Sequence, residues 1–330
     1  MLRKFLAAAG AAVILGLAGP AGAADPVRIG LVPKSLGNGF FDAANKGAQD
    51  AAKELGNVEV IYTGPTTPTA EGQIEIINAL AAQRVDAIAI SANDPDALVP
   101  ALKRAMQRGI KVISWDSGVA KDGRIVHLNP SSNALIGNMC VKLAADVAGS
   151  GPAEVAILSA TPTATNQNTW IEEMKKVLPK YPSLKLVTTV YGDDLADKSY
   201  RETQALLKQY PNLKVIIAPT SVGIVAAAKA IEDAGQSGKI FVTGLGLPSE
   251  LAGHVEKGTV RSFAIWNPID LGYSATQIAV QIARGEKAGP GATIAIGRVG
   301  KVTFDDKAEG AMSDPFVYDK SNVAEFAKIF

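Results

Sequence analysis

Asp116 is the residue whose type and position point most directly to chemistry. It follows the β-branched run Lys111 to Trp115, which predicts a buried strand that ends just before the carboxylate. A carboxylate at that place can accept hydrogen bonds from two neighbouring hydroxyl groups, and hydrogen bonds to a charged group are the strong ones. Its alternative role is to cap a local turn. The position therefore predicts a binding group for a molecule that is rich in hydroxyls.

Polar and aromatic side chains also follow the other predicted strands. Amide side chains donate and accept hydrogen bonds, as hydroxyl groups do, and Trp266 can offer a flat apolar face to a sugar ring. The structural alternatives are a helix start with a capping amide for 166–168 and a core position for Trp266. The candidate ligand-binding residues are Lys34, Asn38, Phe40, Phe41, Ser91, Asp116, Asn166, Gln167, Asn168, Pro219, Thr220, Ser221, Leu245, Trp266 and Asn267.

A repeated rhythm of strands and helices must position these side chains. Short β-branched runs alternate with longer amphipathic stretches, which is typical of parallel sheets with crossover helices. In the third helix, Pro95 should occupy the first position and Pro100 should cause a kink. The predicted strands span 27–32, 58–62, 87–91, 111–115, 154–158, 185–191, 213–218, 240–243, 260–266 and 302–304. The predicted helices span 40–55, 69–83, 95–108, 131–148, 168–178, 198–209, 221–234 and 268–284.

These elements divide into two lobes. About four strand-helix units precede the polar stretch 129–132 and about four follow it, and a chain of about 300 residues is near the size at which one core divides. We therefore predict an α/β protein in which each lobe is a parallel sheet flanked by helices. Because open α/β sheets bind ligands at the carboxyl ends of their strands, the cleft between the lobes is the predicted site.

The first 24 residues have the pattern of a secretory signal peptide. Arg3 and Lys4 precede an apolar run from Phe5 to Leu17, and the small residues Ala21 to Ala24 follow. We predict cleavage near residue 24 and a periplasmic location; a retained membrane anchor is the alternative. The one cysteine, Cys140, lies far from the cleavage site, so the chain offers no thiol for lipidation there and no internal disulfide.

Composition and motifs argue against two other classes of function. Without Arg3 and Lys4 the formal net charge changes from +1 to about −1, so the chain lacks the basic excess that nucleic-acid binding requires. Only His127 and His254 could serve a nucleophile as a histidine base, and the motifs Gly-x-Ser-x-Gly and His-Glu-x-x-His are absent. We predict no enzyme, no cofactor, no bound metal and no nucleic-acid partner.

Five segments carry a family resemblance: KSLGNGFFDAANKGAQDAAKEL (34–55), SANDPDALVPALKRAMQRG (91–109), VISWDS (112–117), TNQNTW (165–170) and FAIWNPIDLG (263–272). They resemble the type I periplasmic sugar-binding proteins of ABC transporters, over about 27–330. The nearest branch resembles the rhamnose-binding proteins, with autoinducer-2-binding proteins as close relatives. The resemblance implies a hinge of three segments between an N-terminal lobe, 25–129 with about 267–291, and a C-terminal lobe, 130–266 with about 292–330.

The resemblance extends to single positions of the candidate site. The ribose-binding pattern falls on Asn38, Phe40, Phe41 and Asp116. Ser117 and Gly246 replace an arginine and a later aspartate of that pattern, which argues against ribose. The autoinducer-2 pattern falls on Lys34, Asp116, Asn166, Gln167, Pro219 and Ser221, with asparagine in place of an aspartate and serine in place of an alanine. Asn38 instead matches the rhamnose-binding type.

We therefore predict a monomeric binding protein that closes on a small sugar, with L-rhamnose preferred, and delivers it to the permease subunits of an ABC transporter in the inner membrane. Autoinducer-2, another deoxyhexose or a polyol is the alternative ligand. An exported enzyme and a DNA-binding regulator are the rival classes, and the signal peptide stands where such a regulator would have its helix-turn-helix. A role as a chemoreceptor partner leaves no sequence motif.

Overall fold

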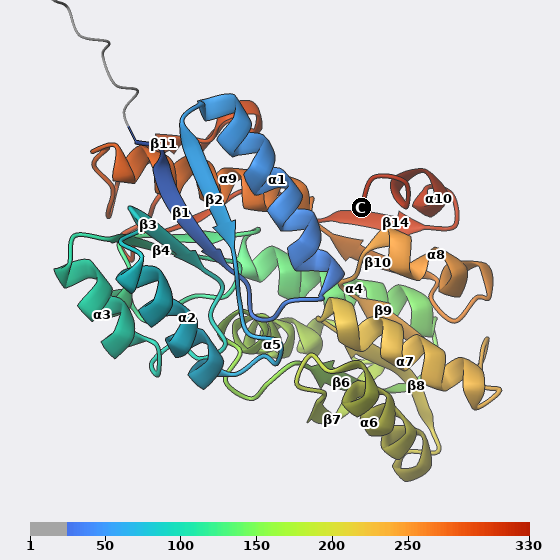
Figure 1. Ribbon diagram of the computed structural model, residues 1–330. Coiled ribbons are helices and arrows are strands. Elements are labelled where there is room, and N and C mark those ends of the chain that lie inside the picture. The colour runs from blue at the N-terminus through green and yellow to red at the C-terminus, as the bar shows by residue number, and fades with distance from the viewer. Residues whose placement is uncertain (1–24) are drawn as a thin grey trace, which may run out of the picture.

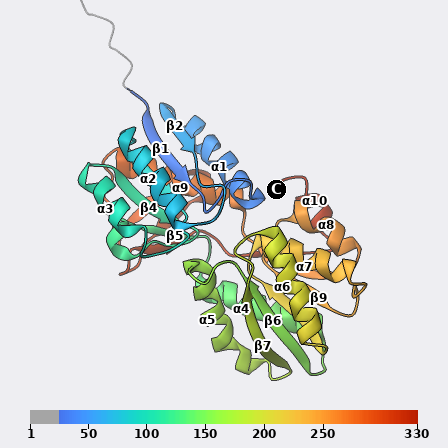
Figure 2. The ribbon, with the colours of Figure 1, turned by 60° about the horizontal axis from the view of Figure 1, so that its bottom comes forward.

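The computed structural model describes residues 25–330, which form two lobes (Figures 1 and 2). Each lobe contains a parallel sheet with helices packed against it, which confirms the predicted fold class. The predicted signal peptide, 1–24, lies outside the described residues. Between residues 25 and 330, no helix has the length and apolar character needed to cross a membrane.

The sheet of the first lobe is entirely parallel, and β1 to β4 were predicted. Its strands are β1 (Val27–Val32), β2 (Val58–Tyr62), β3 (Ala87–Ile90), β4 (Lys111–Trp115), β5 (His127–Asn129) and β13 (Glu309–Ala311). They pair in the order β13-β5-β4-β3-β1-β2. All residues of β3 are buried, because helices cover both faces of a parallel sheet and leave no solvated side.

The second lobe has its own parallel sheet, in the order β7-β6-β8-β9. Its strands are β6 (Ala153–Ser159), β7 (Leu184–Tyr191), β8 (Leu213–Ala218) and β9 (Phe241–Gly244). Two antiparallel pairs complete the strands of the described chain: β10 (Ser262–Ile265) with β14 (Phe316–Asp319), and β11 (Thr293–Ala295) with β12 (Lys301–Thr303). A bridge between Leu245 and Ala264 sets β10 beside β9.

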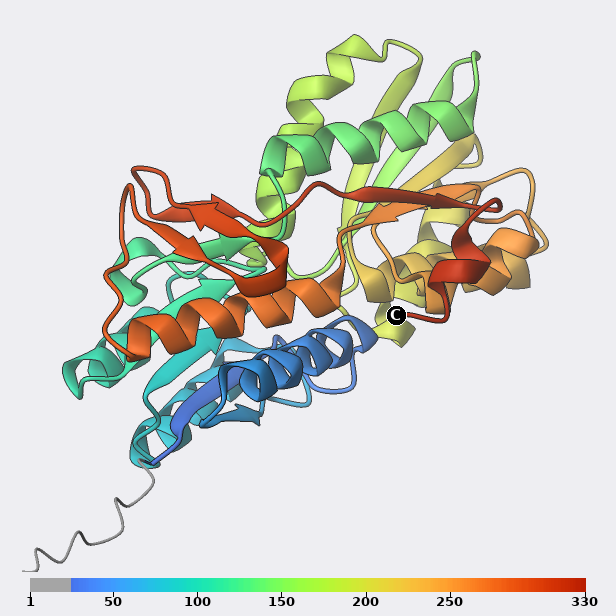
Figure 3. The ribbon, with the colours of Figure 1, turned by 90° about the horizontal axis from the view of Figure 1, so that it is seen from above.

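The helices lie between strands along the chain, as a βαβ arrangement requires, except for α10, which follows the last strand. They are α1 (Gly39–Leu55), α2 (Ala70–Ala82), α3 (Val99–Gln107), α4 (Asn133–Ala148), α5 (Thr165–Val177), α6 (Ala196–Gln209), α7 (Ser221–Asp233), α8 (Pro248–Glu256), α9 (Pro268–Ala283) and α10 (Val323–Phe326). Short 3₁₀ turns span Lys121–Gly123, Leu178–Lys180 and Gly297–Val299. In Figure 3, α1 and α9 lie side by side.

Two glycines allow α1 and α9 to approach closely. A Cβ atom on Gly47 would overlap the backbone carbonyl of Ile269, and one on Gly272 would overlap the carbonyl of Ala44. Backbone atoms cannot move aside as a side-chain end can, so these positions need a residue without a Cβ. The start of α1, which enters the cleft, is thereby fixed against α9.

The C-terminal tail differs from its predicted place. The prediction assigned about 292–330 to the C-terminal lobe, but β13 pairs with β5 at the edge of the first sheet, and β11 packs against α9. Only after Ala311 does the chain return to the second lobe, where β14 pairs with β10 and α10 packs on α8. The correction has a physical cause: the free edge of β5 supplies backbone partners that β13 satisfies.

Some predicted element boundaries were also wrong. Asp94 Oδ1 accepts hydrogen bonds from the backbone N–H groups of Asp96 and Ala97, both at 2.9 Å, and this forms a separate turn. The third helix begins only at Val99, so Pro100 stands in its first turn, where the missing N–H costs nothing and no kink is needed. The strand β5 and the helix α8 were not predicted.

Candidate ligand-binding site

A small cavity of about 40 Å³ lies between the two lobes. It is bounded by loops that follow β1, β4, β7, β8 and β9 and by the first turns of α1, α5 and α7. Twelve of the fifteen candidate side chains line it. The complete lining is Lys34, Asn38, Phe40, Phe41, Asp116, Asn166, Gln167, Trp170, Asp194, Pro219, Thr220, Ser221, Leu245, Ile265 and Trp266.

Asp116 lies at the carboxyl end of β4 and is 4% exposed. Its backbone is in the left-handed region, with φ of 58°, which aspartate adopts more readily than most residues. Ser91 Oγ donates to Oδ2 at 2.8 Å, and Asn166 Nδ2 donates to Oδ1 at 3.1 Å. Burial raises the pKa of Asp116, against the nearby positive charge of Lys34, which lowers it. The carboxylate is thus held in place and still lines the cavity.

Asn166 joins the two lobes at this point. It lies at the start of α5 in the second lobe, and it donates to Asp116 while its Oδ1 accepts from Lys34 Nζ at 3.1 Å. Lys34 is 3% exposed, so its charge is compensated inside the protein. The three side chains form one buried network across the cleft, which belongs to the closed arrangement of the lobes.

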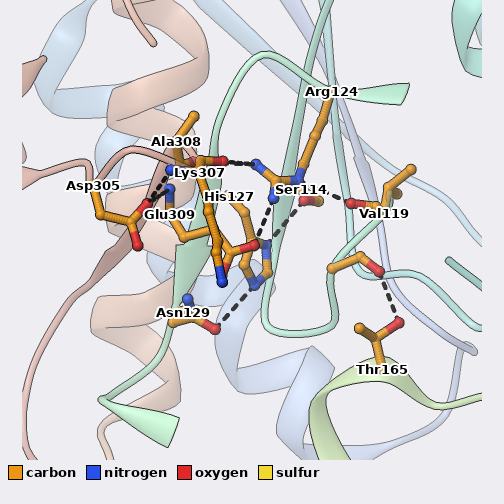
Figure 4. A network of polar contacts seen from close by, with 11 residues as sticks. Ser114, Val119, Arg124, His127, Asn129, Thr165, Asp305, Lys307, Ala308 and Glu309 are labelled. Atoms are coloured by element: carbon orange, nitrogen blue, oxygen red, sulfur yellow. Dashed lines mark hydrogen bonds and ion pairs between the residues drawn. The ribbon is translucent and has the colours of Figure 1, made fainter. Parts of the chain in front are cut away.

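The loop that begins with Asp116 is fixed from two sides (Figure 4). Arg124 donates from Nε to the carbonyl of Val119 at 2.9 Å, and from Nη2 to Glu309 Oε1 at 2.7 Å. Thr165 Oγ1, from the second lobe, donates to the carbonyl of Gly118 at 2.9 Å. The tail strand β13 and the helix α5 therefore both hold the loop that positions Asp116.

Aromatic rings form the apolar side of the cavity. Phe40 meets Trp266 edge to face at 6.1 Å between ring centroids, and Trp170 meets Trp266 at 5.6 Å. Trp266 is 3% exposed, and in residues 25–330 its Nε1 has no hydrogen-bond partner. The indole therefore satisfies both interpretations of the sequence: it is part of the core, and it lines the cavity.

The polar lining residues of the second lobe also form hydrogen bonds that stabilise their own loops. Gln167 Oε1 accepts from Ser159 Oγ at 2.9 Å and from the Ala160 N–H at 2.7 Å. Thr220 caps α7, because its Oγ1 accepts from the backbone N–H of Gly223 at 3.2 Å, and it donates to Asp194 Oδ1. Each residue holds its loop in shape while it lines the cavity.

Three candidates do not line the cavity. Ser91 lies behind Asp116 and orients its carboxylate. Asn168 donates from Nδ2 to the carbonyl of Pro162 at 2.7 Å, and Asn267 caps α9 by accepting from the N–H of Ile269 at 2.9 Å. The amide of Asn168 therefore joins the first turn of α5 to the preceding loop, and Asn267 serves as a helix cap.

The prediction missed three lining residues: Trp170, Asp194 and Ile265. Asp194 follows β7, so its place after a strand, like that of Asp116, is the signal that could have indicated it. Trp170 lies one helical turn after Asn166, on the same face of α5. Ile265 ends β10 directly before Trp266.

Neither histidine lines the cavity. His127 is buried in β5 with Nδ1 2.9 Å from Ser114 Oγ and Nε2 3.1 Å from Asn129 Oδ1 (Figure 4). Burial, with the charge of Arg124, lowers the pKa of His127 to about 3, so the ring is a weak base. His254 lies in α8 beside Glu232. Nor does the described part of the chain hold a cluster of three His, Cys, Asp or Glu side chains that could bind a metal ion.

Sequence comparison identifies a matching family and curated relatives. The family described as periplasmic binding protein domain matches residues 29–287. The D-allose-binding periplasmic protein of Escherichia coli is 25% identical over 267 residues, which cover 79% of this chain and 86% of that protein. The D-ribose/D-allose-binding protein of Pseudomonas aeruginosa is 29% identical over 228 residues, covering 66% and 70%.

Solved structures show the same fold over nearly the whole chain. An ABC transporter solute-binding protein of Clostridium phytofermentas with bound L-rhamnose superimposes with a TM-score of 0.88 at 37% identity, covering 93% of this chain and 100% of that one. LsrB of Clostridium saccharobutylicum in complex with AI-2 gives a TM-score of 0.86 at 26% identity, covering 91% and 99%.

Proposed function

The chain belongs to the periplasmic binding protein family, and from that premise we propose that it is the periplasmic substrate-binding component of an ABC transporter that imports a small neutral sugar, with L-rhamnose preferred. It captures the sugar between its lobes and presents the closed complex to the permease subunits in the inner membrane. It acts as a monomer and catalyses no reaction.

The chemistry of the cavity is the observation that carries this proposal. Asp116 offers carboxylate oxygens that accept hydrogen bonds, and Lys34 donates them. A hydroxyl group both donates and accepts, so a molecule with several hydroxyls satisfies both. Rings beside these groups suit the C–H face of a sugar.

A deoxyhexose fits the apolar part of the lining. Leu245, Ile265 and Phe40 also line the cavity, and these side chains offer no hydrogen bond to a hydroxyl. A methyl group, such as the one at C6 of L-rhamnose, gains from leaving water there. The likeness to the structure with bound L-rhamnose supports the same choice.

Closure of the lobes is part of the proposal. The hydrogen bonds that cross the cleft include those from Lys34 to Asn166, from Asn166 to Asp116, from Thr165 to Gly118, and from Thr163 Oγ1 to the carbonyl of Asn93 at 2.9 Å. Because the lining comes from both lobes, a sugar touches both only when they are together. Binding therefore favours the closed form, and a hinge of three segments permits it.

Autoinducer-2 is the second candidate ligand. The residues of its pattern, Lys34, Asp116, Asn166, Gln167, Pro219 and Ser221, all line the cavity. The structure of LsrB in complex with AI-2 is the neighbour that favours it. The asparagine at 166 and the serine at 221 depart from the pattern, so the deoxyhexose remains the first choice.

Isothermal titration of residues 25–330 tests the proposal. The protein is unfolded and refolded first, which removes any sugar carried through purification. It is then titrated with L-rhamnose, D-ribose, D-allose, D-arabinose, D-fucose and autoinducer-2. We expect L-rhamnose to bind most tightly, with a dissociation constant of about 1 μM or below, and D-ribose weakly. Tighter binding of autoinducer-2 would select the second candidate, and no binding of any of them would contradict sugar uptake.

A further inference from the structure

A second carboxylate, Asp194, lines the cavity from the second lobe. It follows β7 and has φ of 52°, so its backbone is in the same left-handed region as that of Asp116. Its Oδ1 accepts a hydrogen bond from Thr220. Over residues 25–330 its Oδ2 receives no hydrogen bond and the carboxylate has no ion pair, whereas the adjacent Asp193 is paired with Lys198. One oxygen of Asp194 is therefore available to a ligand.

The charges of the lining leave this carboxylate uncompensated. Lys34 is the one cation among the lining side chains, and it already faces Asn166 and Asp116. The charge of Asp194 raises the pKa of Asp116, so the two carboxylates repel each other when the lobes are closed. A hydrogen-bond donor placed between the lobes would relieve that repulsion.

The indole of Trp266 forms an apolar part of the same cavity wall. Its side chain is almost completely buried, and its Nε1 donor lacks a partner in the part of the chain that the structure describes. A ligand that contacts this wall meets the indole ring and must supply hydrogen-bond donors to the carboxylates, which hydroxyl groups do.

We propose that Asp194 is a second acceptor for a ligand hydroxyl and a specificity-determining residue of this site, so that a neutral polyol bridges Asp116 in one lobe and Asp194 in the other. This inference rests on the proposed function, because it assigns a role in the same sugar site. This bridge stabilises the closed form only when the ligand has hydrogen-bond donors on both sides. An anionic ligand is disfavoured by two carboxylates against one lysine.

The neighbouring residue offers a matched control. Asp194→Asn keeps the size of the side chain, and asparagine accepts the left-handed backbone as readily as aspartate does. Asp193→Asn makes the same change in the same loop, also at a left-handed position, with φ of 55°, but outside the cavity lining. Both variants and the wild type are titrated with the sugars of the panel above and with the three L-rhamnose analogues that lack the hydroxyl at C2, C3 or C4.

We expect Asp194→Asn to weaken binding of L-rhamnose by about ten- to a hundredfold, as loss of a hydrogen bond to a charged group does, and Asp193→Asn to change it less than about twofold. One deoxy analogue should bind wild type and Asp194→Asn equally, because the hydroxyl that Asp194 accepts is already missing. A purely structural role would weaken every analogue alike.

The outcomes separate this inference from the proposed function. If wild type binds a sugar of the panel while Asp194→Asn and Asp193→Asn bind it equally well, the role of Asp194 is overturned and sugar binding stands. If every deoxy analogue loses as much affinity in Asp194→Asn as the parent sugar does, the role is also overturned. If wild type binds no sugar of the panel, both the proposed function and this inference fail.

Discussion

The two walls of the cavity are built differently. In the first lobe, Asp116 follows a buried strand and is 4% exposed, with partners from Ser91 and Asn166. In the second lobe, Asp194 is half-buried and its one described partner is Thr220, which also caps α7. The carboxylate of the first wall is therefore fixed by two buried partners, one of them Ser91 of its own lobe, whereas the carboxylate of the second wall is half-buried and fixed by one.

This difference suggests that the two walls contribute differently to affinity and to ligand selection. A wall that is rigid before the ligand arrives loses little entropy on binding, so the first lobe should provide most of the affinity. A wall of helix starts and loops, carried by the other lobe, reaches the ligand only on closure and should decide which ligands hold the lobes together. Changes in the first wall should therefore cost more than matching changes in the second.

We expect the largest effect from acid, which should lower the free energy of unfolding through His127 in the first lobe. The pKa of His127 is about 3, below the 6.5 of an exposed histidine, so the unfolded chain binds an extra proton between these values. The free energy of unfolding should therefore fall as the pH drops from about 6.5 towards 3, by as much as about 5 kcal/mol. Urea unfolding at a series of pH values measures it.

Two histidine variants show which histidine causes this loss of stability. His127→Gln should flatten the fall, whereas His254→Gln, on the surface helix of the second lobe, should retain it. An equally steep fall in wild type and His127→Gln would contradict the assignment of this proton to the first lobe.

Asp116→Asn should cause the largest loss of sugar affinity. The variant keeps the left-handed backbone but removes the charge and replaces one acceptor oxygen by an NH₂ group, so one of the donors that face Asp116 loses its acceptor. We expect L-rhamnose binding to weaken by about 2–5 kcal/mol in isothermal titration. Asp86→Asn, at the opposite end of the same sheet, is the control and should bind as wild type does. A loss for Asp116→Asn smaller than that for Asp194→Asn would reverse the comparison of the walls.

Gly47→Ala should damage the helix that carries part of the first wall. The added methyl overlaps the carbonyl of Ile269, and neither backbone can yield without separating α1 from α9. We expect the free energy of unfolding to fall by about 1–3 kcal/mol in urea titration. Gly253→Ala is the control, because its Cβ meets open space in α8, and it should be neutral or slightly stabilising. Equal stability of the two variants would show that the close approach of α1 to α9 does not contribute to stability.

Gly223→Ala should produce the smallest effect, on the second wall. Its methyl meets the Cγ2 atom of Thr220, a side chain that can rotate, and alanine favours the helix α7 by about 1 kcal/mol. Stability should therefore change little. Rotation of Thr220 away from Asp194 should weaken L-rhamnose binding by about two- to fivefold, as measured by titration. An undisturbed affinity would mean that Thr220 does not need to hold Asp194 in position.

The same comparison explains what could be predicted from the sequence. Asp116 was found because a clear β-branched run ends directly before it, and the alternation of such runs with amphipathic stretches predicted the two sheets. Asp194 follows β7, whose residues are mostly half-buried, and its loop resembles an ordinary polar turn. Asn267 shows the converse: an asparagine after a strand serves the helix instead of the cavity.

The tail strand β13 could not be predicted from the local sequence pattern. The strand β13 is three residues long, Glu309–Ala311, and carries no hydrophobic run that would predict it. It exists because its backbone completes the edge of β5, almost two hundred residues earlier, and because Arg124 binds Glu309. Such a pairing depends on the assembled sheet, so periodicity within a short window does not indicate it.

A crystal structure of residues 25–330 grown with L-rhamnose tests the central claim most directly, because it shows whether one sugar contacts both walls. We predict the sugar between the lobes, with hydroxyls within hydrogen-bond distance of Asp116 and of Asp194 and with its ring against Trp266. A sugar bound elsewhere, or an empty cavity in crystals saturated with L-rhamnose, would contradict the account.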